Sequence, residues 1–254
     1  MKRTGPAQKS SLRDLFSKKG NRKISMIRTV MFDVDDTVYS FHHANECAVA
    51  NLAAYTSAHF GWDQDEFLAR QKAAMADVKR FAGTSGGYRT RLLRYQNMLE
   101  AAGLPIYPHA LVMSNIYRDG ILDNMIPEEG VEDWMRYLKS QNIRILIASD
   151  ATAMQQFLKL ERLGLISYVD AMVTSEEAGV EKPHPKFFER CNEKSKCRPN
   201  EVLFIGDNPE KDYSGASLAG YHALWYNPLN KPNDKKIEEL RHFSEASIFL
   251  SNND

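Results

Sequence analysis

Three carboxylates and a hydroxyl follow the first apolar run of the chain, which begins at Arg28. They belong to Asp33, Asp35, Asp36 and Thr37. Crowded like charges cost free energy unless a cation or a hydrogen-bond network compensates them. The stretch therefore indicates either a metal-binding site at the end of a buried strand or an acidic turn, since Asp and Thr are also common turn residues.

Further side chains capable of chemistry lie in three segments downstream. Ser149 ends one apolar run, and Asp207 and Asp212 follow another. Lys182 lies between these runs, in a loop that two prolines brace. In a doubly wound sheet the carboxyl ends of parallel strands open into one crevice. We therefore expect these side chains to surround a single point together with Asp33.

The elements that would position these residues follow two patterns. From 44 to 122 the apolar periodicity is helical, whereas helices and strands alternate from about 125 onwards, which favours a parallel sheet covered on both faces. The sequence therefore predicts an α/β fold, a doubly wound Rossmann-like parallel sheet with an inserted all-helical domain. The predicted strands are 27–34, 143–148, 171–174, 202–205, 223–226 and an edge strand at 247–250. The predicted helices are 44–60, 63–81, 88–102, 108–122, 128–141, 152–163, 185–194, 210–219 and 234–243.

Three parts of the chain follow from these patterns. Residues 27–40 and 125–254 are expected to form a discontinuous core domain, and residues 41–124 a helical cap domain. Residues 1–26 carry eight basic side chains and one acidic one, whereas the remainder has a net charge of −7. We expect a disordered basic tail here; an arm for nucleic acid or an acidic surface and a transit peptide are the alternatives. Nothing in the remainder predicts nucleic-acid binding.

Composition limits the cellular compartments in which the protein is expected. The 254 residues suffice to bury a full hydrophobic core, and the three cysteines have no metal-binding spacing. No apolar run is long enough to cross a bilayer, and no secretory signal is evident. A cytoplasmic protein without membrane association is therefore expected, and the sequence is silent on its oligomeric state.

The four segments resemble the motifs of the haloacid dehalogenase-like (HAD) superfamily, in order and with each at the expected strand end or loop. The resemblance covers about 27–228 and implies a Mg²⁺-dependent phosphatase acting on a small phosphorylated metabolite. The matching motifs are Asp33-Val-Asp35-Asp-Thr37, then Ser149, then Lys182, then Gly206-Asp207 with Asp212.

The resemblance also implies roles for the two first-motif carboxylates. Asp33 would be the nucleophile that accepts the phosphoryl group as an aspartyl phosphate. Asp35 would protonate the leaving oxygen and then activate water. A carboxyl group needs a raised pKa for both tasks, and the neighbouring charge of Asp33 is expected to raise the pKa of Asp35.

The remaining motif residues are implied to hold the metal and the phosphate. Mg²⁺ would be bound by the side chains of Asp33 and Asp207 and the backbone carbonyl of Asp35, with Asp212 orienting ligands. The phosphoryl oxygens would be bound by Ser149 and Lys182.

Asp150 departs from the pattern, because many relatives have Asn after the second-motif hydroxyl. A carboxylate aimed at a phosphoryl group would repel it. Asp150 precedes a predicted helix, so we expect it to be the N-cap of that helix. Lowered activity is the alternative.

The helical insertion between motifs one and two resembles that of phosphoglycolate phosphatase-type enzymes, and the stretch 160–183 resembles pyrimidine 5′-nucleotidases. Substrate-facing candidates in or near the insertion are His42, Tyr88, Arg89 and Arg91, with a solvated helix face and packing residues as the alternative. A nucleoside monophosphate or a sugar phosphate is the expected substrate.

Two other functions remain open from the sequence. A phosphomutase of the same superfamily would transfer the phosphate between hydroxyls. A non-catalytic binding protein with a HAD fold is suggested by Asp150 and the basic tail, although such a protein would not need all six motif residues.

Overall fold

A parallel sheet lies at the centre of the molecule. The structure is a computed structural model, and it describes residues 26–83 and 86–249. Its six strands follow the order β3-β2-β1-β4-β5-β6, and every neighbouring pair is parallel. The predicted doubly wound α/β fold is thus confirmed. The strands are β1 (Thr29–Phe32), β2 (Arg144–Ser149), β3 (Ala171–Thr174), β4 (Val202–Gly206), β5 (His222–Tyr226) and β6 (Glu239–Leu240).

Successive side chains of a strand point to opposite faces of the sheet, and here the side chains on both faces are apolar. Helices therefore cover both faces. In β1, Phe32 packs into one buried apolar cluster and Met31 into the other. The first face carries α6 (Val131–Ser140), α7 (Ala153–Arg162) and the 3₁₀ helix η5 (Phe243–Phe249). The second carries α8 (Ser175–Ala178), α9 (Pro185–Ser195) and α10 (Gly215–Leu218).

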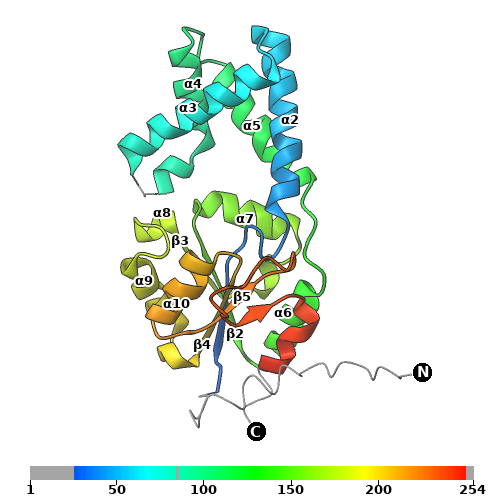
Figure 1. The fold of residues 1–254 in the computed structure, drawn as a ribbon, viewed down its shortest axis with the longest axis vertical. Coiled ribbons are helices and arrows are strands. Elements are labelled where there is room, and N and C mark those ends of the chain that lie inside the picture. The colour runs from blue at the N-terminus through cyan, green and yellow to red at the C-terminus, as the bar shows by residue number, and fades with distance from the viewer. Residues whose placement is uncertain (1–25, 84–85, 250–254) are drawn as a thin grey trace, which may run out of the picture.

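A separate group of helices, called here the helical lobe, lies beyond the carboxyl ends of the strands (Figure 1). Gly120 allows two of its helices to touch, since an added Cβ there would lie 2.8 Å from the Cα of Ala48. The remainder of the described chain is called the sheet lobe. The helical lobe comprises α2 (Phe41–Phe60), α3 (Gln64–Ala82), η1 (Gly86–Arg89), α4 (Arg91–Ala101) and α5 (His109–Asp123).

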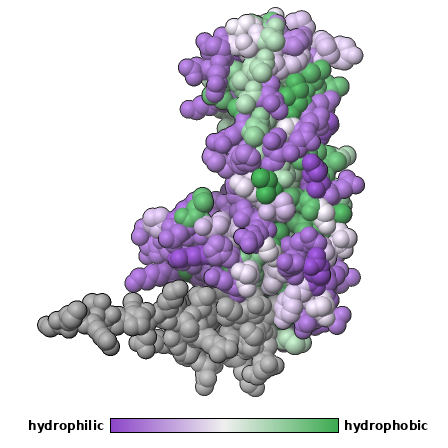
Figure 2. Space-filling view, turned by 90° about the vertical axis from the view of Figure 1, so that its right-hand side faces the viewer, coloured by the Kyte–Doolittle hydropathy of each residue, from purple (hydrophilic) through white to green (hydrophobic). Residues whose placement is uncertain are grey.

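Two chain segments, 33–40 and 124–130, connect the lobes, and they are bonded to each other. Tyr39 forms an antiparallel bridge with Pro127, and the amide of Glu128 donates to the carbonyl of Val38 at 2.9 Å. Hydrophilic side chains cover most of the face in Figure 2, with hydrophobic ones gathered on the helical lobe and near the junction. No helix among the described residues is long and apolar enough to cross a lipid bilayer.

The carboxyl-terminal elements differ from the prediction. Residues 234–243 form turns and the short β6 rather than a helix, and 247–249 belong to η5 rather than to an edge strand. The open edge of β5 explains the first difference, because the segment pairs with it. The backbone amide of Trp225 donates to the carbonyl of Glu238, and the backbone amide of Asn227 donates to the carbonyl of Leu240. The predicted basic tail, apart from Met26, lies outside the described residues.

Two predicted helices begin differently. The helix expected over 210–219 starts as a π-helical segment, η4 (Pro209–Ser214), before α10. Asn208 caps it by accepting hydrogen bonds from the amides of Glu210 and Lys211. The helix expected over 88–102 is divided at Thr90 between η1 and α4.

Candidate active site

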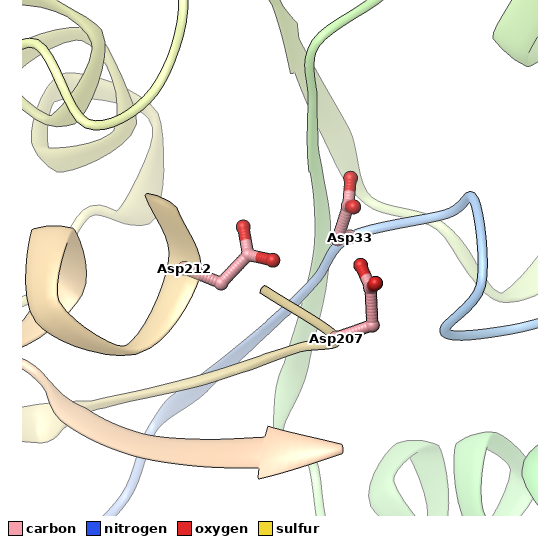
Figure 3. Close-up of side chains that lie close together, drawn as sticks. All are labelled: Asp33, Asp207 and Asp212. Carbon is pink, nitrogen blue, oxygen red and sulfur yellow. The ribbon is translucent and has the colours of Figure 1, made fainter. Parts of the chain in front are cut away.

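Three aspartates meet at the carboxyl edge of the sheet. Asp33 follows β1, Asp207 follows β4, and Asp212 lies in η4. Each offers a carboxylate oxygen within 4.8 Å of the others, and the three side chains lie close together (Figure 3). Parallel pairing of β1 with β4 produces this meeting, since the amide of Asp33 donates to the carbonyl of Ile205 at 2.9 Å. The expected convergence of the strand ends is therefore observed.

Gly206 makes room for the third carboxylate. A Cβ at Gly206 would lie 2.4 Å from the carboxylate of Asp212, a distance that side chains do not tolerate. In the space that the glycine leaves, Asp212 accepts hydrogen bonds from the amide of Asn208 at 2.9 Å and from Lys182 Nζ at 2.7 Å. Asp212 is only 1% exposed, so this hydrogen-bonded position is fixed.

Lys182 lies between two of the aspartates and is 3% exposed. Besides Asp212, its Nζ contacts the carbonyl of Ala148 at 2.9 Å and lies 3.0 Å from Asp33 Oδ1. The last contact lacks hydrogen-bond geometry, which leaves Asp33 Oδ1 buried without a hydrogen-bond partner among the described residues. Burial lowers the pKa of Lys182, but the charges of Asp212 and Asp33 outweigh it and raise that pKa, so the ammonium stays charged.

The same crowding perturbs the other carboxyl groups. Burial raises the pKa of Asp33 to about 7 despite the opposing charge of Lys182. Burial and the charge of Asp33 raise the pKa of Asp207 to about 8. One ammonium is therefore too little charge for three carboxylates. The all-oxygen donor set of these three aspartates fits a hard divalent cation such as Mg²⁺.

Asp35 has partners that the sequence did not reveal. Its Oδ1 accepts hydrogen bonds from Tyr39 Oη at 2.6 Å and from Lys159 Nζ at 2.5 Å. Burial raises the pKa of Asp35, but Lys159 and these hydrogen bonds outweigh it and hold that pKa below its usual value. The expectation of a raised pKa is therefore wrong for this arrangement. Tyr39 lies only four residues from Asp35 in sequence, which is a weak indication of contact. Nothing in the sequence indicates that Lys159 contacts Asp35.

Ser149 lies buried at the end of β2, which pairs with β1, the strand that Asp33 follows. Its Oγ accepts a hydrogen bond from Gln156 Nε2 at 2.8 Å, which leaves the hydroxyl proton of Ser149 for another acceptor. Gln156 was not singled out from the sequence, because nothing in a helical glutamine indicates a buried contact with the preceding strand end.

Asp150 is not the N-cap of α7, so that prediction is wrong. Thr152 is the N-cap, and its side chain accepts a hydrogen bond from the amide of Gln155. Asp150 instead accepts hydrogen bonds from the backbone amide of Lys182 at 2.9 Å and from Lys211 Nζ at 2.8 Å. The carboxylate thus fixes the loop that carries Lys182, and the charge of Lys211 offsets its own.

A cavity of about 380 Å³ opens over these residues, between the two lobes. Arg89 and Arg91, two of the predicted substrate-facing residues, line it. Tyr88 is not among the lining residues and lies against the guanidinium of Arg89. His42 is also outside the lining and forms an exposed pair with Glu46. The motif residues Asp33, Asp35, Ser149, Lys182, Asp207 and Asp212 all contribute to the wall.

The site and fold agree with the family comparison. A model of the haloacid dehalogenase-like hydrolase family matches residues 27–220. The chain belongs to this family of hydrolases, which confirms the resemblance inferred from the four motifs.

Several relatives of the chain are named as phosphatases. The chain is 31% identical to ribulose-1,5-bisphosphate 5-phosphatase of Halopiger xanaduensis, over 80% of this chain and 86% of the relative. It is 32% identical to glyceraldehyde 3-phosphate phosphatase of Methanopyrus kandleri, over 77% of this chain and 82% of the relative. It is 27% identical to pyrimidine 5′-nucleotidase YjjG of Escherichia coli, over 82% and 89%.

Solved structures share the architecture. The HAD-hydrolase YfnB of Bacillus subtilis, determined bound to magnesium, matches with a TM-score of 0.67 at 25% identity, over 89% of this chain and 99% of that one. A 2-haloacid dehalogenase of Pseudomonas syringae matches with a TM-score of 0.70 at 23% identity, over the same shares, which supports the fold alone.

Proposed function

We propose that the protein is a Mg²⁺-dependent phosphatase that hydrolyses a small phosphate monoester through an aspartyl-phosphate intermediate. The observation that carries the proposal is the convergence of Asp33, Asp207 and Asp212 around the buried ammonium of Lys182, beneath a cavity large enough for a small metabolite. The names of the phosphatase relatives support it.

Asp33 is the proposed nucleophile. Its Oδ1 is buried and free of hydrogen bonds among the described residues, so it is available to form a bond to phosphorus while the ester oxygen leaves. Lys182 and the hydroxyl of Ser149 would offset and bind the negative charge of the phosphoryl oxygens. Both groups hold their positions through other contacts, Lys182 through Asp212 and Ser149 through Gln156.

Asp35 is the proposed proton donor to the leaving oxygen and the base for the attacking water. In the described arrangement its carboxylate is held by Lys159 and Tyr39. Displacement of one of these partners by a bound substrate would make this carboxyl group easier to protonate. The cavity wall includes both Asp35 and Lys159, so a substrate has access to this pair.

The proposed Mg²⁺ ligands are the carboxylates of Asp33 and Asp207 and the backbone carbonyl of Asp35, with Asp212 positioning the others. When bound, the cation would offset the charge that develops on the transferred phosphoryl group. Negative charge is in excess at this edge of the sheet, with three carboxylates and one ammonium, and this excess supports the assignment.

Residues 41–124 are proposed to be a cap domain on a core formed by 27–40 and 125–254. The cavity between the lobes supports this division, since the sheet lobe supplies the motif residues and the helical lobe the opposite wall. The substrate proposed for this arrangement is a nucleoside monophosphate or a sugar phosphate.

The test is phosphate release from a panel of sugar phosphates, triose phosphates and nucleoside monophosphates, with Mg²⁺ and with EDTA. We expect turnover only with the cation, and none for Asp33→Asn, whose melting temperature should stay close to wild type. Asp133→Asn, at an exposed position in α6, is the matched control and should retain wild-type activity. Inactivity on the whole panel, or transfer of the phosphate between hydroxyls without release, would contradict the proposal.

A further inference from the structure

The charges that line the cavity are divided between the lobes. All of the lining carboxylates come from the sheet lobe: Asp33, Asp35, Asp36, Asp150, Asp207 and Asp212. The helical lobe contributes three arginines and no carboxylate to the described lining: Arg89, Arg91 and Arg118. A bound molecule therefore meets carboxylates on one side and guanidinium groups on the other.

Most of the lining cations already have a carboxylate partner. In the sheet lobe these ion pairs are Lys159 with Asp35, Lys182 with Asp33 and Asp212, and Lys211 with Asp150 and Glu181. In the helical lobe they are Arg89 with Glu181 and Arg118 with Asp119. Arg91 is the exception: within residues 26–83 and 86–249 no carboxylate pairs with it. Its charge is therefore left for something that the folded chain does not supply.

Arg91 is held in place by neutral groups. Its Nη2 donates to Tyr117 Oη at 2.8 Å, and the guanidinium carbon lies 4.4 Å from the centre of the Tyr117 ring. Tyr117 Oη donates in turn to Asn45 at 2.6 Å, so three helices fix one guanidinium. The Nε of Arg91 is buried and has no acceptor among the described residues. A guanidinium in a fixed orientation with unused donors is suited to a carboxylate or phosphate.

A second guanidinium reinforces the charge. Arg94 lies one turn further along α4, is 6% exposed, and has no carboxylate partner in the described part of the chain. Its Nε is also buried without an acceptor. Burial and the charge of Arg91 lower the pKa of Arg94 to about 10, which still leaves it charged near neutral pH. Arg94 is buried and Arg91 is half-buried, and two adjacent cations so placed without counter-charge are unfavourable unless an anion binds beside them.

We propose that Arg91, with Arg94 behind it, forms a second anion subsite in the helical lobe, and that the preferred substrates are phosphate esters bearing a second anionic group, a carboxylate or another phosphate. The inference rests on the proposed phosphatase function and narrows its substrate class. The scissile phosphate lies against the sheet lobe, and the second anion lies against Arg91 across the cavity.

The test uses matched pairs of compounds with Mg²⁺. 3-Phosphoglycerate and glycerol 3-phosphate differ by a carboxylate, and glucose 1,6-bisphosphate and glucose 6-phosphate differ by a phosphate. We expect kcat/KM for the two-anion member of at least one pair to exceed that of its partner by about tenfold or more, the scale of a charge-assisted contact. The pair that shows the preference identifies which anion the subsite accepts.

Arg91→Met should lower kcat/KM for the two-anion compound about tenfold more than for its partner. Arg136→Met, at an exposed position in α6, should keep the wild-type ratio. A wild-type ratio near one for both pairs, or a preference that survives Arg91→Met, would overturn the inference.

Binding separates this inference from the proposed function. Calorimetric titration of Asp33→Asn and of the double variant with Arg91→Met measures affinity for the same compounds without turnover. Tighter binding of a two-anion compound that is lost in the double variant supports the subsite even if no ester is hydrolysed by the wild type. Equal affinities for both members of both pairs would refute it, whatever the enzyme hydrolyses.

Discussion

At the scale of single residues, the site depends on one missing side chain. Gly206 has no Cβ, and the carboxylate of Asp212 occupies the space where one would lie. This position allows Asp212 to accept from Lys182 and from the amide of Asn208 together. The placement of the ammonium beside Asp33 therefore depends on a residue that performs no chemistry.

Gly206→Ala should displace Asp212 and release Lys182 from its position. A displacement of about 1 Å in a catalytic group costs about 100-fold in rate, so we expect kcat to fall by about that factor. Steady-state kinetics on the best substrate, together with a melting curve, provides the measurement. Ser217→Ala, an exposed change in the neighbouring α10, should leave both unchanged. Wild-type kcat in Gly206→Ala would contradict this account of Asp212.

The aspartate cluster should also make cation binding sensitive to pH. The pKa values of Asp33 and Asp207 are raised to about 7 and about 8, so both carboxyl groups bind protons as the pH falls below those values. Protons then compete with Mg²⁺ for the same oxygens.

We expect Mg²⁺ to raise the melting temperature more at pH 8 than at pH 6, because the ligands are ionised at the higher pH. Thermal unfolding with and without Mg²⁺ measures the shift. Asp207→Asn should lose most of the shift, whereas Glu210→Gln, at an exposed neighbouring position, should retain it. An equal shift at both pH values would argue against ligation by these two carboxylates.

At the scale of elements, Asp170 joins α6 to the sheet. Its Oδ2 accepts from the amide of Ile145 at 2.8 Å, and both carboxylate oxygens accept from Lys139 Nζ in α6. Burial raises the pKa of Asp170, but these hydrogen bonds outweigh it and hold that pKa below its usual value. A depressed pKa means that the carboxylate stabilises the folded state above the unfolded pKa, and that this contribution disappears as the pH falls through the folded one.

Asp170→Asn should therefore lower the free energy of unfolding by about 1 kcal/mol at pH 7. The difference from wild type should shrink below about pH 4, where the wild-type carboxyl group becomes protonated. Urea unfolding at pH 7, 5 and 3.5 measures it. Asp133→Asn, which removes an exposed carboxylate from α6, should differ from wild type by much less. A difference that grows with acid would be inconsistent with the depressed pKa.

The elements that the sequence predicted correctly are those encoded by their own residues. The apolar runs of β1, β2 and β4 are unambiguous, and the polar residues after them meet because parallel strands share one edge. The short β6 escaped prediction because its pairing depends on the open edge of β5 rather than on its own sequence.

The site residues were likewise predictable where their own sequence positions identify them, and not where distant packing brings them together. Its motif residues follow strands or lie in a braced loop, which the sequence displays. The partners of Asp35 and Ser149, namely Lys159 and Gln156, lie on α7, and only the packing of that helix brings them to the site. The role of Asp150 was mistaken because its partner Lys211 is 61 residues away in sequence.

At the scale of the whole molecule, the cavity is built from two lobes and its walls have different origins. The sheet lobe contributes the aspartates and Lys182, and the helical lobe contributes arginines and Tyr117. Arg89 and Glu181 form an ion pair across the junction, with Arg89 Nε 2.7 Å from Glu181 Oε1. Ligand entry and exit therefore involve the contact between the lobes as well as the chemistry at the strand ends.

The paired connections at Tyr39 and Pro127 have a consequence for the speed of the enzyme. Because the two segments are bonded to each other, any separation of the helical lobe from the sheet lobe would pivot about this one seam and carry the lobe through solvent. Such a motion is slowed by friction with the surrounding liquid. If departure of inorganic phosphate awaits this swing, turnover on a good substrate falls as the liquid thickens.

We therefore expect kcat to decrease with the relative microviscosity of sucrose solutions, and the much slower Asp35→Asn enzyme to be insensitive to it, because chemistry then limits its rate. A polymeric thickener that raises only the bulk viscosity is the control and should leave kcat unchanged. Equal insensitivity of both enzymes would mean that the seam imposes no limit. A steep dependence would make the drag on a swinging lobe, rather than the breaking of a phosphate ester, the step that sets the pace of catalysis.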